Sequence, residues 1–235
     1  MIVDFSAHFG RGPAIDQHCT PAELRSLLSS AGIDRAVVSD LGAAFGDEAP
    51  DIPLPETMVA FASVSPDDGP SRVRSVKGIR IYPTYQPWDF SNGALRSLLA
   101  AARDADLIVQ VYLRLQDPRA LPVIAAPDAV LSSLGPIIEG NKNVRFVISG
   151  ANYRELAANA ALFSHGNLWA DTSHIQHPIN SIAKLVRAIG PTRVLFGSNA
   201  PVFYPHSGIF QILHSPISDA EKERILGGNA VELLG

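Results

Sequence analysis

The sequence predicts an α/β protein of one domain, residues 1–235, whose parallel strands close into a single (β/α)8 barrel of the TIM type. Three observations predict this fold. The length of 235 residues fits a barrel, which typically takes about 250 residues and can be as short as about 200. Short apolar runs recur along the chain and alternate with helical patterns. Several of these runs are nearly continuous, as expected for strands that are buried on both faces.

The expected elements follow one another in a regular order. The first strand, residues 1–5, precedes a loop and then a helix that begins at Thr20 and Pro21, where a threonine cap is followed by proline at the first helical position. This helix ends near Gly32. We expect further strands at residues 35–38, 58–64, 76–82, 107–113, 144–148, 167–170 and 193–196. We expect further helices at residues 92–104, 118–134, 153–163, 182–189 and 219–226.

Two connections contain little helical pattern. Residues 65–75 include Pro66, Gly69 and Pro70, and residues 39–57 include three further prolines. A βαβ crossover takes at least about 10–12 residues, and proline interrupts a helix. We therefore expect reduced helices after the second and third strands, and a second copy of the chain could cover that side as a homodimer. An open doubly wound sheet is the competing fold, but no glycine-rich phosphate loop follows the first strand.

Composition excludes several classes of function. The net charge of −4 shows no basic excess of the kind that binds nucleic acid. No apolar run approaches the ~20 residues that cross a bilayer, and the first residues lack the features of a signal peptide. The single cysteine, Cys19, cannot form an internal disulfide. We therefore expect a cytoplasmic protein whose partner is a small-molecule substrate or ligand, with no nucleic acid and no membrane.

In a barrel of this type the functional residues lie at the carboxyl ends of the strands. Polar side chains follow each expected strand at that end. They are Ser6, His8, Ser39, Asp40, Ser65, Tyr82, Tyr112, Arg114, Ser149, Asp171, His174, Ser198 and Asn199. The sequence therefore predicts a site at the mouth of the barrel.

Four segments carry a resemblance to a known family. They are VDFSAHFG at residues 3–10, KGIRIYP at 77–83, RVLFGSNAP at 193–201, and ILGGNAVEL at 225–233. Together they resemble the amidohydrolase-related family, in the branch that contains aminocarboxymuconate-semialdehyde decarboxylase and the dicarboxylate lactonases. The resemblance extends along the whole chain and implies a TIM barrel that acts on small carboxylated or lactone substrates.

The departures from the family pattern fall on its metal ligands. Family members that bind a divalent metal use two histidines on strand one, a histidine on a middle strand and an aspartate on strand eight. Here the first histidine position holds Ser6, the middle-strand position falls at or near Tyr112, the strand-eight position holds Asn199, and only His8 matches. The strand-six histidine, an acid/base in some members, corresponds to Ser149 or Gly150. A catalytic zinc typically needs three protein ligands, so we expect no metal and no other cofactor. A rebuilt site that draws on Asp171, His174, His177 or His206 is the remaining alternative.

The candidate roles are divided between proton transfer and substrate binding. The catalytic candidates are His8, Asp171 and His174, and the substrate-binding candidates are Ser6, Arg80, Tyr82, Tyr112, Arg114, Ser149 and Asn199. Arg80 and Arg114 have the planar fork that suits a substrate carboxylate.

Each role has a structural alternative. His8 could be a histidine without a catalytic role that is hydrogen-bonded inside the barrel mouth. Arg80 could form an ion pair within the barrel. Ser6 and Ser149 could simply fill the space of the absent metal. Asp171 and His174 could be a hydrogen-bonded loop cluster, and Cys19 beside His18 is expected to be an inert loop thiol.

Two functions fit these residues. The first is a metal-independent hydrolase or lyase that acts on a small carboxylated or lactone substrate at the barrel mouth. The second is a non-catalytic relative that binds a small molecule or serves as an assembly partner. The sequence favours a hydrolase but leaves open whether the protein is an enzyme.

Overall fold

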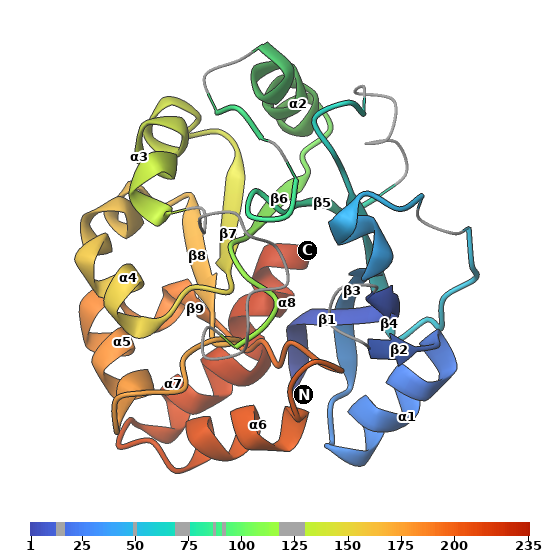
Figure 1. The fold of residues 1–235 in the computed structure, drawn as a ribbon. Helices are drawn as coiled ribbons and strands as arrows, with labels where there is room; N and C mark the ends of the chain where they lie inside the picture. Colours follow the sequence, from blue (N-terminus) through green and yellow to red (C-terminus); the bar gives the residue numbers. More distant parts are fainter. Residues whose placement is uncertain (13–16, 49–50, 69–75, 87, 91–92, 118–129) are drawn as a thin grey trace.

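The computed structural model describes residues 1–12, 17–48, 51–68, 76–86, 88–90, 93–117 and 130–235. Within them, the strands form one sheet of nine in the order β2-β1-β3-β4-β5-β6-β7-β8-β9. Figure 1 shows these strands curled into a ring with most helices on the outside. The strands are β1 (Val3–Gly12), β2 (Gln17–Cys19), β3 (Arg35–Asp40), β4 (Met58–Ser63), β5 (Gly78–Ile81), β6 (Ile108–Tyr112), β7 (Arg145–Ser149), β8 (Leu168–Asp171) and β9 (Val194–Leu195).

The parallel strands confirm the predicted fold class. Each neighbouring pair from β1·β3 to β8·β9 is parallel, and only the short β2 runs antiparallel to β1. The curl brings the segment around β9 back to β1. The Phe5 N–H donates to the Phe196 carbonyl at 2.8 Å, and the His8 N–H donates to the Ala200 carbonyl at 2.8 Å. These two bonds join the first strand to the last, as in a TIM barrel.

Helices pack around most of the ring. They are α1 (Pro21–Ser30), α2 (Gly93–Asp104), α3 (Leu131–Gly140), α4 (Tyr153–Ala158), α5 (Ser181–Ile189), α6 (Pro205–Leu213), α7 (Asp219–Glu223) and α8 (Asn229–Leu234). The described residues also contain the turns η1 (Gly42–Phe45), η3 (Ala160–His165), η4 (Pro191–Arg193) and η5 (Arg224–Gly228). The expected start of α1 is confirmed, because Thr20 and Glu23 form a reciprocal capping box ahead of Pro21.

Several predicted boundaries were wrong or incomplete. The helix expected at 118–134 falls partly outside the described residues, and the described helix α3 runs instead from Leu131 to Gly140. The helix expected at 153–163 divides into α4 and η3, and the one at 219–226 into α7 and η5. Neither β2 nor α6 nor α8 was predicted. In the described part, β3 is followed only by the short turn η1, and this side of the ring carries loops in Figure 1.

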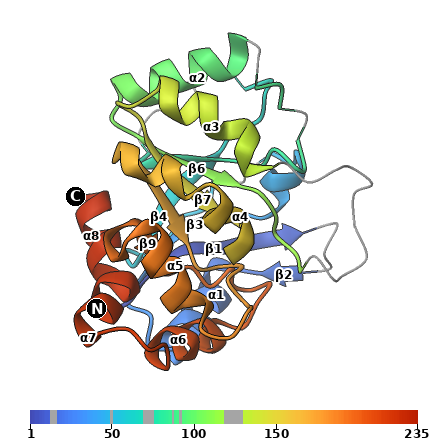
Figure 2. The ribbon, with the colours of Figure 1, turned by 90° about the vertical axis from the view of Figure 1, so that its left-hand side faces the viewer.

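The interior of the barrel is apolar in its lower half, at the amino ends of the strands, and polar in its upper half, at their carboxyl ends. In the lower half, Val3, Phe5, Val37, Phe61 and Leu195 pack with Ala230, Leu233 and Leu234 of α8. Figure 2 shows α8 beside the chain termini, at the end opposite the loops that follow the strands. Helix α8 therefore closes the amino end of the barrel, and the polar residues lie toward the mouth. No described helix is long and apolar enough to cross a membrane.

Candidate functional site

A bulge in β1 sets which side chains enter the barrel. The pairing of β1 with β3 shifts register between Asp4 and Ala7, and such a shift changes the alternation of inward and outward side chains. Before the shift, Phe5 packs in the lower apolar cluster. After it, Ala7 packs with the outer core, while Ser6 and His8 contact the polar interior. The bulge thus turns two polar residues of β1 toward the middle of the barrel.

The carboxylate of Asp171 lies at the centre of the polar interior. It is at the end of β8 and 1% exposed. Its Oδ2 accepts short hydrogen bonds from the hydroxyl groups of Ser6 and Ser149, and its Oδ1 accepts the Ser173 N–H at 3.0 Å. The structure therefore brings together three of the predicted site residues, Ser6, Ser149 and Asp171. A Cβ on Gly197 would lie 2.9 Å from Asp171, so the close approach of β9 to this cluster requires glycine.

Gln110 connects this cluster to Arg80. The amide Nε2 donates to the Ser149 hydroxyl at 2.7 Å and to the Ser6 hydroxyl at 3.2 Å. Its Oε1 accepts the Arg80 Nε–H at 2.6 Å. Because the amide donates to both hydroxyl oxygens, the hydroxyl protons are free to point at Asp171. A buried cation and a buried carboxylate are thus joined through one neutral amide.

The remaining N–H groups of Arg80 hold the backbone. Its Nη atoms donate to the carbonyl oxygens of Ala7, Phe5 and Val37 at 2.8–3.0 Å, and the side chain is fully buried. A substrate carboxylate at Arg80 would have to displace some of these bonds. The described partners of Arg80 are thus a neutral amide and backbone carbonyls, not the carboxylate of the ion pair that was the structural alternative, and the carboxylate-binding role stays a prediction.

His8 lies above this network, between two tyrosines. Its Nε2 is 3.3 Å from the Tyr82 hydroxyl, and its ring packs edge-on against Tyr112 with 5.0 Å between centroids. Burial, assisted by the positive charge of Arg80, lowers the pKa of His8 well below its usual value, so the ring is neutral near pH 7. The other nitrogen, Nδ1, is buried and has no hydrogen-bond partner among the described residues.

Tyr112 is hydrogen-bonded to Asn199, at the end of the last strand. The Tyr112 hydroxyl donates to Asn199 Oδ1 at 2.7 Å, and Asn199 Nδ2 donates to the Leu115 carbonyl. Asn199 has a φ of 58°, a left-handed conformation that asparagine tolerates better than most residues. Tyr112 also stacks on Tyr82 at 5.7 Å. The structure therefore brings His8, Tyr82, Tyr112 and Asn199 together at the upper edge of the polar interior.

Arg114 and His174 lie outside this group. Arg114 forms a two-pronged ion pair with Glu155 at 2.7 and 2.8 Å. Burial acts to raise the pKa of Glu155, but hydrogen bonds from Arg114 and Asn152 outweigh it and lower that pKa. His174 Nε2 lies 3.2 Å from the Gln116 carbonyl, and no described hydrogen bond joins His174 to Asp171. Burial lowers the pKa of His174 to about 4. The predicted acid/base pair of Asp171 and His174 is therefore not joined by a hydrogen bond among the described residues.

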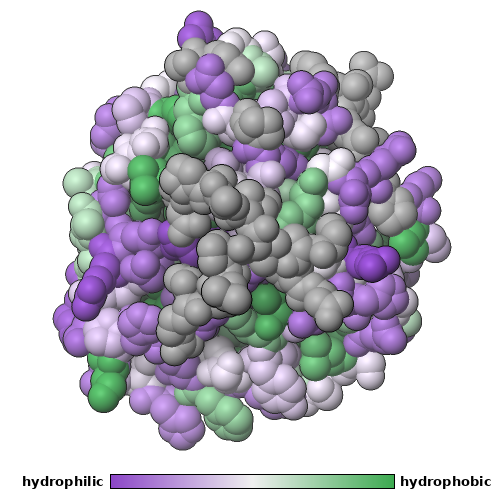
Figure 3. All heavy atoms as spheres, in the orientation of Figure 1, coloured by the Kyte–Doolittle hydropathy of each residue, from purple (hydrophilic) through white to green (hydrophobic). Residues whose placement is uncertain are grey.

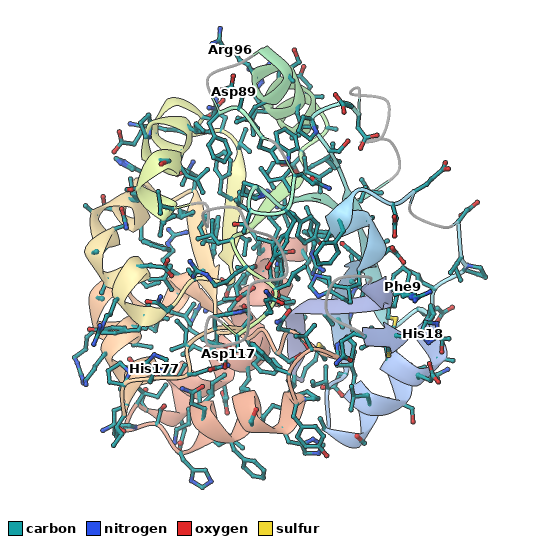
Figure 4. All side chains as sticks on the ribbon, viewed as in Figure 1. Phe9, His18, Asp89, Arg96, Asp117 and His177 are labelled. Carbon is teal, nitrogen blue, oxygen red and sulfur yellow. The ribbon has the colours of Figure 1, made fainter. Side chains whose placement is uncertain are left out.

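His18, His177 and Cys19 lie away from the centre of the barrel. Figure 4 shows His18 and His177 on opposite sides of the molecule, away from the centre of the ring. Cys19 is buried in β2 rather than in a loop, and burial together with Glu23 raises the pKa of its thiol to about 11. This is the environment of an inert thiol.

The residues present do not fit a divalent metal. In the described part of the chain, no three His, Cys, Asp or Glu side chains are grouped as a metal would require. Ser6, at the position where the resemblance implies a metal-binding histidine, instead donates a hydrogen bond to Asp171, and so does Ser149. Asn199 already accepts from Tyr112 and donates to Leu115. Serine hydroxyls and an amide are weak ligands for zinc, and here the described protein groups already bind them.

Sequence reasoning missed three residues that organise the site. Gln110 has no motif, and only its position as one polar residue in the apolar strand β6 marks it. Asp4 is fully buried and accepts from the N–H of Ser6 and from both the N–H and hydroxyl of Ser198. Glu155 had been expected only as part of a helix. A buried polar residue within an apolar strand was the available signal for the first two.

A crevice of about 430 Å³ adjoins the Asp171 cluster at the carboxyl ends of β8 and β9. One wall is α6, and the other is the segment that follows β8. Figure 1 looks onto the end of the barrel where these strands finish, and Figure 3 shows hydrophilic and hydrophobic residues interspersed around the margin of that face. The crevice is an opening near the predicted site that a small molecule could enter.

Comparison with known proteins agrees with this architecture. The sequence profile of the family described as Amidohydrolase matches residues 6–235. No curated protein matches the chain.

Solved structures of similar fold cover nearly the whole chain. The 2,6-dihydroxybenzoate decarboxylase from Rhizobium has a TM-score of 0.76 at 12% identity, covering 99% of this chain and 98% of that one. The 5-carboxyvanillate decarboxylase from Sphingomonas paucimobilis has a TM-score of 0.72 at 12% identity with the same coverage. A putative 2-pyrone-4,6-dicarboxylic acid hydrolase from Pseudomonas putida has a TM-score of 0.71 at 14% identity, covering 100% of this chain and 97% of that one. At such identities the likeness establishes the fold.

Proposed function

The chain belongs to the amidohydrolase family, and from this premise we propose that it is a metal-independent hydrolase or lyase that acts on a small carboxylated or lactone substrate at the mouth of the barrel. The observation that carries the proposal is the state of His8. This residue is neutral, fully buried and at the carboxyl end of the barrel, and its Nδ1 has no partner among the described residues. Leaving a buried polar atom unpaired costs about 1–3 kcal/mol, and a bound substrate or water would remove that cost.

His8 would serve as the proton-transfer group. In the tautomer with the proton on Nε2, the Nε2–H donates a hydrogen bond to the Tyr82 oxygen. Nδ1 then has a lone pair that can accept a proton from an attacking water. Tyr112 packs against the ring and fixes its orientation. Burial raises the pKa of Tyr82, so its phenol stays protonated near pH 7 and does not compete as a base.

The names of similar structures support the class of substrate. A decarboxylase of this fold has been solved with bound 2,6-dihydroxybenzoate, and an amidohydrolase from Burkholderia multivorans with bound HEPES. Both ligands are small molecules, and the similar structures include two decarboxylases and a putative 2-pyrone-4,6-dicarboxylic acid hydrolase. We extend to this chain the general class, hydrolysis or decarboxylation of a small carboxylated ring or lactone.

The test is turnover without metal. Purified protein in EDTA is assayed for hydrolysis of dihydrocoumarin and 2-pyrone-4,6-dicarboxylate, and for decarboxylation of 2,6-dihydroxybenzoate. We expect turnover that EDTA does not reduce, and a loss of about 100-fold or more in His8→Gln, the range for a general base. His214→Gln, at an exposed histidine outside the barrel, is the matched control and should keep full activity. Turnover that requires added zinc would contradict the metal-independent route.

A second candidate is favoured by a different observation. The oxygen and nitrogen groups of Ser6, Ser149 and Gln110 satisfy Asp171 and one another, which is the arrangement of a stable interior. This supports a non-catalytic relative that binds a small molecule. The same assay separates the two candidates: no turnover of any substrate, together with unchanged binding in His8→Gln, would favour the non-catalytic protein.

A further inference from the structure

The crevice beside α6 has a lining that bears no charge. Its polar lining consists of four hydroxyl groups and two amides, from Thr172, Ser173, Ser198, Ser207, Gln176 and Gln211. The remaining lining is the ring of Phe203 and two glycines. An ionised ligand that entered here would lose part of its hydration without gaining an opposite charge.

Two carboxyl groups lie directly beneath the crevice. The N–H and hydroxyl of Ser198, which lines the crevice, both bind Asp4. The glycine beside it, Gly197, is in close contact with Asp171. Burial raises the pKa of Asp4, and the nearby Asp171 raises it further. A ligand carboxylate would place a further negative charge close to these two acids. Repulsion between like charges would disfavour its binding.

The two arginines predicted to bind a substrate carboxylate are already bound elsewhere. Arg80 donates to Gln110 and to three backbone carbonyls, and Arg114 is held by Glu155. Neither lines the crevice. The described lining of the crevice therefore contains no charged side chain that would balance an anion.

The hydrogen-bonding groups of α6 present acceptors. The Ser207 hydroxyl donates to the Tyr204 carbonyl, which leaves its oxygen lone pairs for a ligand. The Gln211 Nε2 donates to Ile175 and Ser181, which leaves its Oε1 as an acceptor. These two residues are four positions apart and so lie on the same face of the helix. Hydroxyl groups on the ligand would supply the matching donors, and Phe203 offers a flat apolar surface.

We propose that this crevice binds a small uncharged molecule that carries hydroxyl groups on a flat ring, and that it rejects the corresponding carboxylate. If the ligand is the substrate, the proposed hydrolase acts on lactones or esters rather than on carboxylates. Only that last step rests on the proposed function. Binding to the crevice stands by itself and is tested by binding alone.

The experiment compares two molecules of nearly the same shape. Methyl 2,6-dihydroxybenzoate is uncharged, and 2,6-dihydroxybenzoate is an anion at pH 7. Calorimetric titration of the full chain should show an affinity for the ester at least about 10-fold higher than for the carboxylate. Ser207→Leu, which places an apolar side chain in the crevice, should reduce ester binding by about 10-fold or more.

Two further variants make the test decisive. Ser30→Leu is the matched control, because Ser30 is an exposed helical serine with the same hydroxyl bond to the carbonyl three residues earlier; it should bind the ester normally. Ser207→Lys adds a cation at the rim and should raise the affinity for the carboxylate about 10-fold. Carboxylate binding as tight as ester binding would overturn the proposal, as would ester binding that Ser207→Leu leaves unchanged. Absence of ester binding at about 10 mM would also overturn it.

Discussion

Arg80 and Gln110 are joined by a hydrogen bond of 2.6 Å in the interior of the barrel. Through it, a fully buried guanidinium is connected to the hydroxyls of Ser6 and Ser149 and so to the carboxylate of Asp171. Buried charges are usually paired or bound to a metal. Here the amide of Gln110 and the two serine hydroxyls make the connection, so hydrogen bonds between neutral groups link the buried cation to the buried carboxylate.

The first prediction concerns this amide. Gln110→Leu removes the acceptor of Arg80 Nε and the donor to both serines. We expect a loss of about 3 kcal/mol in the free energy of unfolding, because a buried charge is left incompletely paired. Urea denaturation followed by circular dichroism measures it. Gln17→Leu, in the peripheral strand β2, should change stability by no more than about 0.5 kcal/mol. Equal effects of the two variants would show that Gln110 does not organise the interior.

The second prediction concerns metal. Protein purified without chelator should contain well under one equivalent of zinc or manganese by mass spectrometry, because only His8 remains at a family ligand position. Ser6→His plus Asn199→Asp restores two ligand types beside His8, and this variant should gain zinc. Ser6→Gln plus Asn199→Asp is the control that adds bulk without an imidazole, and it should stay empty. One equivalent of metal in the natural protein would mean that a rebuilt site exists.

The fold was predictable because each strand is a short apolar run between turn residues. All eight predicted strands exist, from β1 to β9 with the added β2. The short helix α8 was missed because it continues directly from the π-type turn η5. Its first residues contain neither a capping side chain nor a proline that would mark a helix start. A helix that closes the barrel by packing on Phe5 and Val3 is a tertiary feature, and local periodicity does not report it.

The positions of the candidate residues could be predicted from the strand ends, but their hydrogen-bond partners could not. Ser6, His8, Ser149, Asp171 and Asn199 are all buried, and their roles in a site stay predictions. The sequence could not show that Asp171 binds the two serines, nor that Arg114 is held by Glu155. These pairs join residues 22 to 165 positions apart, so they depend on barrel closure and on the bulge in β1.

The third prediction concerns Arg114. Glu155→Gln keeps the capping interaction with Asn152, because a glutamine can also accept that N–H, but it removes the charge opposite Arg114. We expect a loss of about 1–2 kcal/mol in the free energy of unfolding, measured by urea denaturation. Asp219→Asn, in an exposed ion pair with Lys222 on α7, should be nearly neutral. An equally small effect of Glu155→Gln would contradict a structural role for its ion pair.

The last prediction concerns pH and His174. Burial lowers the folded-state pKa of this histidine to about 4, whereas an unfolded histidine titrates near 6.5. Between these values the unfolded chain binds more protons, so stability is complete above about pH 6.5 and is lost as the pH falls toward 4. The shift corresponds to about 3 kcal/mol at full protonation of the unfolded state.

His174→Gln tests this assignment, because glutamine does not titrate and its amide can still donate to the Gln116 carbonyl that His174 contacts. The decline in unfolding free energy from pH 6.5 to pH 4.5 should be smaller in the variant by about 2–3 kcal/mol. His165→Gln, at a partly exposed histidine on η3, should leave the decline as it is in the natural protein. His8 is also neutral and buried, so part of the decline should persist in His174→Gln and should become smaller still when both histidines are replaced. A decline that His174→Gln does not alter would place His174 in solvent rather than in the buried setting that its contacts with Phe203 and Gln116 describe.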